Sequence, residues 1–148
     1  MNRDEFYART MHTPDDPDRA VRRATLREIS RLLLPLHRSL IEAARADFAF
    51  AYEAVDKPSH LLQLLGEHPF FAWLKPMTSL IVDIDETART DFEAAQFDEI
   101  LRRVESLVAN GGNAEFSDHY RPLLQRDVDV AIAHAALRQA LLRLANDR

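Results

Sequence analysis

The 148-residue sequence contains no cysteine and only three glycines. The absence of cysteine excludes disulfide scaffolds, thiolate metal sites and cysteine nucleophiles. Because the glycines are Gly66, Gly111 and Gly112, the chain has neither a glycine-rich phosphate loop nor a Gly-x-Ser-x-Gly turn. Valine and isoleucine, which favour strands, number only seven and six. These absences exclude several common enzyme motifs and argue against a β-rich fold.

The sequence also lacks long apolar runs and an excess of positive charge. No uninterrupted apolar run approaches the ~20 residues that a membrane-spanning helix needs. The first residues, Met1–Phe6, lack the basic-then-apolar layout of a secretory signal, so we expect a cytoplasmic protein that does not act at a membrane. The formal net charge of −5 disfavours general binding to nucleic acids, which depends on neutralising phosphates.

The residues that are abundant favour helices. The sequence has 21 Ala, 20 Leu, 17 Arg and 10 Glu, all of which have high helix propensity. We therefore predict an all-α protein, a compact bundle of about five to six helices. Its length fits one domain, and we expect a flexible N-terminal arm over residues 1–14 followed by a single helical-bundle domain over residues 15–148.

The first long helix is predicted to begin near Pro17, because acidic residues surround a proline there. Apolar residues then recur every three or four positions from Leu26 to Ala51, and the stripe continues across Pro35. Since an interior proline removes a backbone hydrogen bond and crowds the preceding turn, we expect either one helix kinked at Pro35 or two helices broken there.

The later helices are placed by caps, prolines and glycines. We expect short helices over residues 60–65 and 69–75, then one over 77–89, with the break at Pro76. The next should begin at Thr90 or Asp91 and end at Asn110, and Asn113 should cap a restart. A last long helix should follow Pro122, with this inward face: Leu124, Val128, Ala131, Ala135, Leu141 or Leu142, and Leu144.

Motifs for catalysis and metal binding are missing. No glutamate is followed by histidine three residues later, and no two histidines are three, four or five residues apart. We therefore expect no catalytic residue, metal or cofactor. One alternative stays open: if the first and last long helices pack together, His37 and His134 meet in the core and form a metal or small-ligand site with Asp83 and Glu86.

Arginines form a basic strip on the first long helix. It consists of Arg19, Arg22, Arg23, Arg27 and Arg31. Residues 18–45 carry a net charge of +4 and residues 83–99 a net charge of −6. These segments can pair within one chain or between two copies; a second alternative is that the strip contacts a nucleic-acid backbone.

Aromatic residues cluster in two segments, at Phe48, Phe50 and Tyr52 and at Phe70, Phe71 and Trp73. The second group is a candidate core plug, since large aromatics dominate buried area. Alternate residues of a helix point in different directions, so Phe48, Phe50 and Tyr52 cannot all face one core. Because aromatics are enriched at interfaces, we assign all six to an interaction surface.

The leading hypothesis is therefore a non-enzymatic interaction or regulatory module that acts as a homodimer, with an unidentified protein as a further candidate partner. The metal or small-ligand protein built on His37 and His134 is the first alternative. Contact with a nucleic-acid backbone through the arginine strip is the second.

Overall fold

The computed structural model describes residues 17–109 and 111–147, and these residues fold into helices without any strand. The elements are α2 (Pro17–Ala51), α3 (Pro58–Glu67), the short 3₁₀ helix η1 (Pro69–Leu74), α4 (Lys75–Arg89), α5 (Ala94–Val108), α6 (Ala114–Arg126) and α7 (Val128–Asn146). The prediction of an all-α bundle of about five to six helices is confirmed. The arm predicted over residues 1–14 lies outside the described residues.

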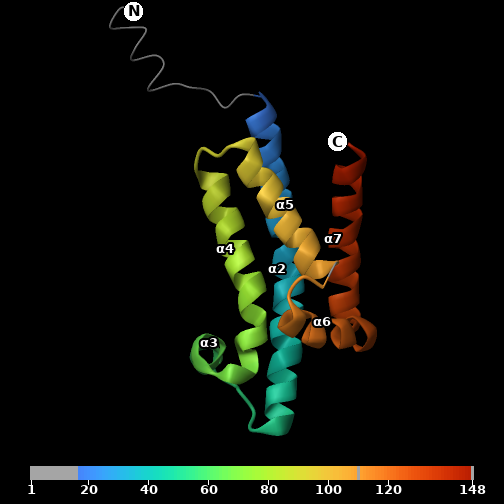
Figure 1. Ribbon diagram of the computed structural model, residues 1–148. Coiled ribbons are helices and arrows are strands. Elements are labelled where there is room, and N and C mark those ends of the chain that lie inside the picture. The colour runs from blue at the N-terminus through green and yellow to red at the C-terminus, as the bar shows by residue number, and fades with distance from the viewer. Residues whose placement is uncertain (1–16, 110, 148) are drawn as a thin grey trace, which may run out of the picture.

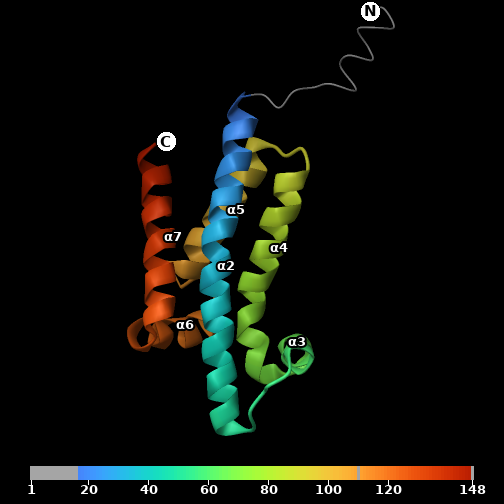
Figure 2. The ribbon, with the colours of Figure 1, turned by 180° about the vertical axis from the view of Figure 1, so that it is seen from behind.

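Helix α2 is the central element. Figures 1 and 2 show α4 along one side of it and α7 along the other, and these two helices make its most extensive contacts. Leu26, Ile29, Leu33, Leu36 and Leu40 of its predicted stripe are completely buried. The apolar periodicity therefore identified the side of α2 that faces the core.

Pro35 does not divide α2 into two helices, so the alternative of a break there is wrong. A proline at this position removes the hydrogen bond to the carbonyl of Arg31. Both residues lie on the exposed side of the helix, where water can solvate that carbonyl. Continuous packing of the buried leucines on either side of Pro35 then holds the helix together.

Several predicted boundaries are close to the observed ones, and two are wrong. Pro76 lies in the first turn of α4, where its missing N–H costs no hydrogen bond. Helix α5 begins at Ala94 instead of Thr90 or Asp91, because Glu93 and Gln96 form a reciprocal capping box. Pro122 lies inside α6, and Asp127 caps the last helix by accepting a hydrogen bond from the N–H of Val130.

A tight connection joins α5 to α6. Gly111 has φ +64°, a conformation that side chains other than glycine rarely adopt. The N–H of Gly112 donates to the carbonyl of Ser106 at 2.9 Å. The chain passes close to the Ser106 side chain here, and a Cβ at Gly112 would lie 1.7 Å from its hydroxyl oxygen. As predicted, Asn113 then caps α6, and its side chain accepts from the N–H of Phe116 at 3.0 Å.

Candidate functional site

Helix α7 has two apolar faces on opposite sides. The inner face packs against the bundle through Val130, Leu137, Ala140 and Leu141, which are all buried. On the opposite side Val128, Ile132 and Leu142 are 71%, 63% and 55% exposed. In both views α7 lies at the edge of the bundle, and no other described helix covers its outer side (Figures 1 and 2).

This arrangement corrects the inward face that the sequence predicted for the last helix. Val128 and Ala135 were assigned to the core, and both are exposed. Of the two alternatives Leu141 and Leu142, Leu141 is buried and Leu142 is 55% exposed. Apolar residues occupy 13 of the 19 positions of α7 and occur on opposite sides of it, so the 3.6-residue period fits more than one face. Packing of α7 against the bundle buries Val130 and Leu137, which were not predicted, together with Leu141.

The exposed side of α7 has the spacing of a helix–helix seam. Its outer face, as we call it, consists of Val128, Ile132, Ala135, Gln139 and Leu142. These residues follow one another at intervals of four, three, four and three, the pattern with which two helices pack along their length. The small side chain of Ala135 keeps the middle of this face low enough for the close approach of another helix.

The structure divides the six aromatic residues that were assigned to an interaction surface. Phe48, Phe71 and Trp73 are at most 4% exposed and belong to the core, so their assignment to a surface is corrected. Phe48 contacts the rings of Phe70 and Phe71, with centroids 5.4 and 5.3 Å away. Phe70 is half-buried at the edge of this cluster, whereas Phe50 and Tyr52 are exposed.

The two candidate histidines are not brought together. Helices α2 and α7 do pack side by side, but His37 faces α4, where its Nε2 lies 2.9 Å from the hydroxyl of Thr78. His134 faces α6, and its Nδ1 lies 2.6 Å from the hydroxyl of Tyr120. This separation removes the geometric premise of the metal or small-ligand alternative.

The candidate acidic ligands have other roles. Asp83 pairs with Arg103 of α5 at 2.8 Å, and the exposed Glu86 lies one turn further along α4. Across residues 17–109 and 111–147, no three His, Asp or Glu side chains are grouped so that they could hold a metal ion.

The basic strip is partly used inside the fold. The guanidinium of Arg23 donates to the carbonyls of Ala88 and Thr90 and lies over the ring of Phe92. Arg19 donates to the carbonyl of Phe92 at 3.2 Å, and both arginines lie within 4.0 Å of Asp91. Pairing of the basic and acidic segments within one chain, one of the two arrangements expected, is what the structure shows.

The other three arginines of the strip are more accessible to solvent or have only a local contact. Arg22 is half-buried, and Arg27 and Arg31 are exposed on the outer side of α2. Arg31 donates to the carbonyl of Arg27 at 3.2 Å. Because two of the five arginines are fixed inside the fold, the strip presents less positive charge to a nucleic acid than the sequence indicated.

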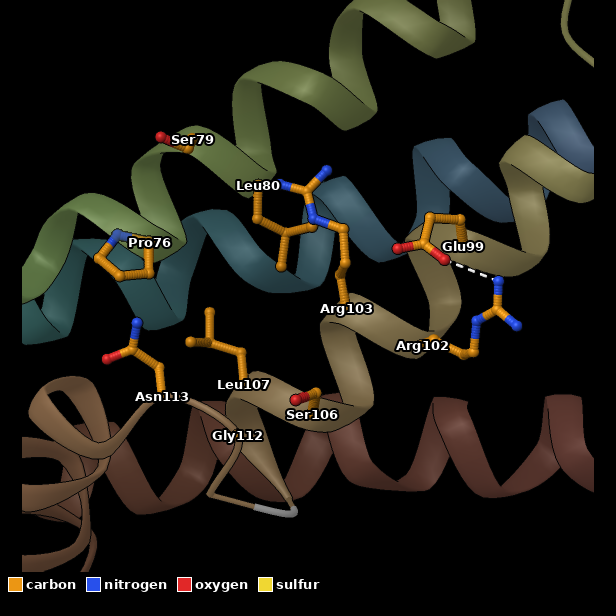
Figure 3. A pocket seen from close by; sticks show the side chains of 10 residues that line it. All are labelled: Pro76, Ser79, Leu80, Glu99, Arg102, Arg103, Ser106, Leu107, Gly112 and Asn113. Carbon is orange, nitrogen blue, oxygen red and sulfur yellow. Dashed lines mark hydrogen bonds and ion pairs between the residues drawn. The ribbon is translucent and has the colours of Figure 1, made fainter.

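A cavity of about 480 Å³ lies between α4 and α5 (Figure 3). Its charged residues are already paired, because Arg102 binds Glu99 at 2.6 Å and Arg103 binds Asp83. The hydroxyls of Ser79 and Ser106 also line it, but no histidine that could activate them does. The lining therefore gives no basis for a catalytic role.

Burial of the two histidines has a consequence for stability. Desolvation lowers the pKa of His37, and desolvation together with the charge of Arg138 lowers the pKa of His134, from the ordinary 6.5. Below pH 6.5 the unfolded chain therefore binds protons that the folded chain does not yet accept. Stability should fall as the pH decreases from 6.5 and stay nearly constant above it.

We expect urea unfolding at pH 7.5, 6.5 and 5.5 to show this loss, by at most about 1.4 kcal/mol per pH unit for each histidine. His37→Gln should flatten the profile, because glutamine does not titrate and its amide can still bind Thr78. A His37→Gln profile as steep as that of the wild type would contradict a contribution from His37.

Comparisons of the chain with protein-family models, curated proteins and solved structures found no match. No described helix is both long and apolar enough to cross a membrane. Ile132 and Gln139 of the outer face and the pairing of Tyr120 with His134 were not predicted from the sequence. Apolar residues of the inner face, such as Val130, Leu137 and Leu141, follow the same helical spacing, so no local signal in the sequence separates the outer face from it.

Proposed function

We propose that this protein is a non-enzymatic interaction module that acts as a homodimer in the cytoplasm, and that the outer face of α7 forms its dimer interface. One observation carries the proposal: α7 is apolar on both sides, and only one side is covered within the chain. A helix face that carries several large apolar side chains is normally buried against another element. A second copy of the same helix would cover the remaining face.

The charges at the two ends of α7 favour an antiparallel arrangement of the two copies. The first turn contains the acidic Asp129 and the last turn the basic Arg143. When two such helices run in opposite directions, each acidic start lies beside a basic end, where Arg143 also pairs with Glu28 of its own chain at 3.1 Å. If the two-fold axis crosses the outer face at the level of Leu137 along the helix, Ile132 of one copy lies opposite Leu142 of the other. Such a self-complementary interface closes as a dimer.

The expected affinity is modest. Three large side chains in each copy are 55% to 71% exposed, and each would contribute on the order of 1 to 2 kcal/mol on burial. Association itself costs several kcal/mol in lost freedom of motion. With the burial terms at their upper end and a cost of association of about 4 kcal/mol, the dissociation constant is on the order of 1 μM. Gln139, a polar residue within the seam, would help to fix the register of the two helices.

Sedimentation equilibrium tests the proposal. The wild type should show a monomer–dimer equilibrium, and Ile132→Glu should raise the dissociation constant by about 100-fold or more, because it places a carboxylate from each copy in an apolar seam. Phe50→Glu is the matched control, since it introduces the same carboxylate in place of another large apolar side chain, one that is 96% exposed at the far end of α2. It should leave the dimer unchanged.

Three results would contradict the proposal. The first is a wild-type protein that stays monomeric up to a concentration of about 100 μM, well above the dissociation constant expected. The second is a dimer that neither substitution weakens. The third is a dimer that Phe50→Glu disrupts and Ile132→Glu does not, which would assign self-association to the exposed aromatics at the end of α2.

A further inference from the structure

A second, smaller cavity lies where the C-terminal end of α5 meets helices α6 and α7. Its volume is about 200 Å³. Its polar lining consists of Ser117, Tyr120, Arg121, His134 and Arg138. Ser117 and Arg121 are one turn apart on α6, and His134 and Arg138 are one turn apart on α7. Two helices therefore direct pairs of hydrogen-bonding side chains toward one space.

The charged side chains that line this cavity are all basic. The sequence has 24 acidic residues, yet none of them lines the cavity. Arg102, Arg103, Arg126 and Arg143 each pair with a carboxylate. Within the part of the chain that the structure describes, neither cavity arginine has such a partner. Two guanidinium groups thus face a small space without a counter-charge.

Arg121 and His134 each lie beside a defined neighbour. The guanidinium of Arg121 lies against Gly111, because a Cβ built there would be 3.0 Å from its Nη2. Tyr120 is almost completely buried, and burial raises the pKa of its phenol well above the ordinary value, so it stays protonated. Its hydroxyl can donate to Nδ1 of neutral His134, and the remaining ring hydrogen then lies on Nε2, which becomes a donor.

We propose that this cavity binds a phosphate group. The two guanidinium groups, the Nε2–H of His134 and the hydroxyl of Ser117 can donate to several oxygens of one tetrahedral anion, and guanidinium groups suit phosphate oxygens in particular. The volume is below the about 300–1,000 Å³ of sites for drug-sized ligands, so the group is inorganic phosphate or the terminal phosphate of a larger molecule. This inference is independent of the proposed dimer, because His134 and Arg138 do not belong to the outer face of α7.

Isothermal titration calorimetry with sodium phosphate at pH 7.5 and constant ionic strength tests the inference. We expect saturable binding with a dissociation constant on the order of 1 mM or tighter. Arg121→Gln and Arg138→Gln should each weaken it by about tenfold or more, since each removes a guanidinium group. Arg38→Gln is the matched control, because Arg38 is an exposed arginine on α2 away from the cavity, and it should bind like the wild type.

The same titration with glycerol phosphate distinguishes the two sources of the group. Binding at least as tight as that of inorganic phosphate identifies a phosphate carried by a larger molecule, and binding of inorganic phosphate alone identifies the free ion. Circular dichroism shows whether each variant folds, and Arg138→Lys replaces Arg138→Gln if the latter does not. The inference is overturned if neither compound gives saturable heat, or if the folded Arg121 and Arg138 variants bind like the wild type.

Discussion

Replacing Phe71 by alanine is expected to lower the free energy of unfolding by about 3 to 5 kcal/mol. Phe71 is completely buried in η1, and its ring lies 5.3 Å from that of Phe48 and 5.4 Å from that of Phe70. The substitution would leave a cavity where η1 packs against the end of α2. The neighbouring rings cannot fill this cavity without losing their own contacts. Urea unfolding followed by circular dichroism measures the loss.

The matched control is Phe50→Ala, which removes the same atoms from a side chain that is 96% exposed. We expect its effect on the stability of the folded chain to stay within about 0.5 kcal/mol. Equal losses for the two substitutions would contradict the burial of Phe71 and the exposure of Phe50. The pair therefore separates the core from the surface in a part of the sequence where aromatic composition alone does not.

The aromatic segments show why part of the candidate surface could not be predicted. The sequence indicates correctly that Phe48 and Phe50 face different sides, because they are two residues apart on a helix. It does not indicate that η1 folds back against the end of α2 and covers Phe48. That contact joins segments more than twenty residues apart, and local periodicity carries no information about it.

Helix boundaries were predictable where one residue has one local role. Asn113 caps α6, and Pro76 lies in the first turn of α4, as their chemistry requires. The start of α5 was misplaced because four consecutive residues, Thr90 to Glu93, include three that can cap a helix. Only Glu93 has Gln96 three residues later to complete the capping box.

Helix α7 was predictable as a helix but not in its orientation. On α2, charged residues alternate with the leucine stripe, and one face is clearly inward. On α7, alanine, leucine, valine and isoleucine occupy nearly every direction, and only the packing of α2 distinguishes the inner face from the outer. Apolar residues on both sides of α7 made its inner face unpredictable. They are also the reason for proposing a second copy as the partner of the outer face.

Replacing Arg23 by alanine is expected to lower the free energy of unfolding by about 2 to 4 kcal/mol. Its side chain is only 14% exposed, and it donates to the carbonyls of Ala88 and Thr90 at the end of α4. A helix ends with carbonyls that lack partners within the helix, and an arginine supplies charged donors for them. Without Arg23 these carbonyls lose their partner, and the ring of Phe92 loses the cation above it.

Arg22→Ala is the control for this prediction, since Arg22 lies beside Arg23 in the basic strip but forms no hydrogen bond or ion pair with the residues that the structure describes. Its loss should change stability by about 0.5 kcal/mol or less. Arg23→Lys should restore part of the difference, because an ammonium group keeps the charge but cannot reach two carbonyls in the same fixed geometry. If Arg22→Ala and Arg23→Ala are equally mild, Arg23 does not hold the end of α4 to α2, and the strip would then be a surface feature along its whole length, as the nucleic-acid alternative requires.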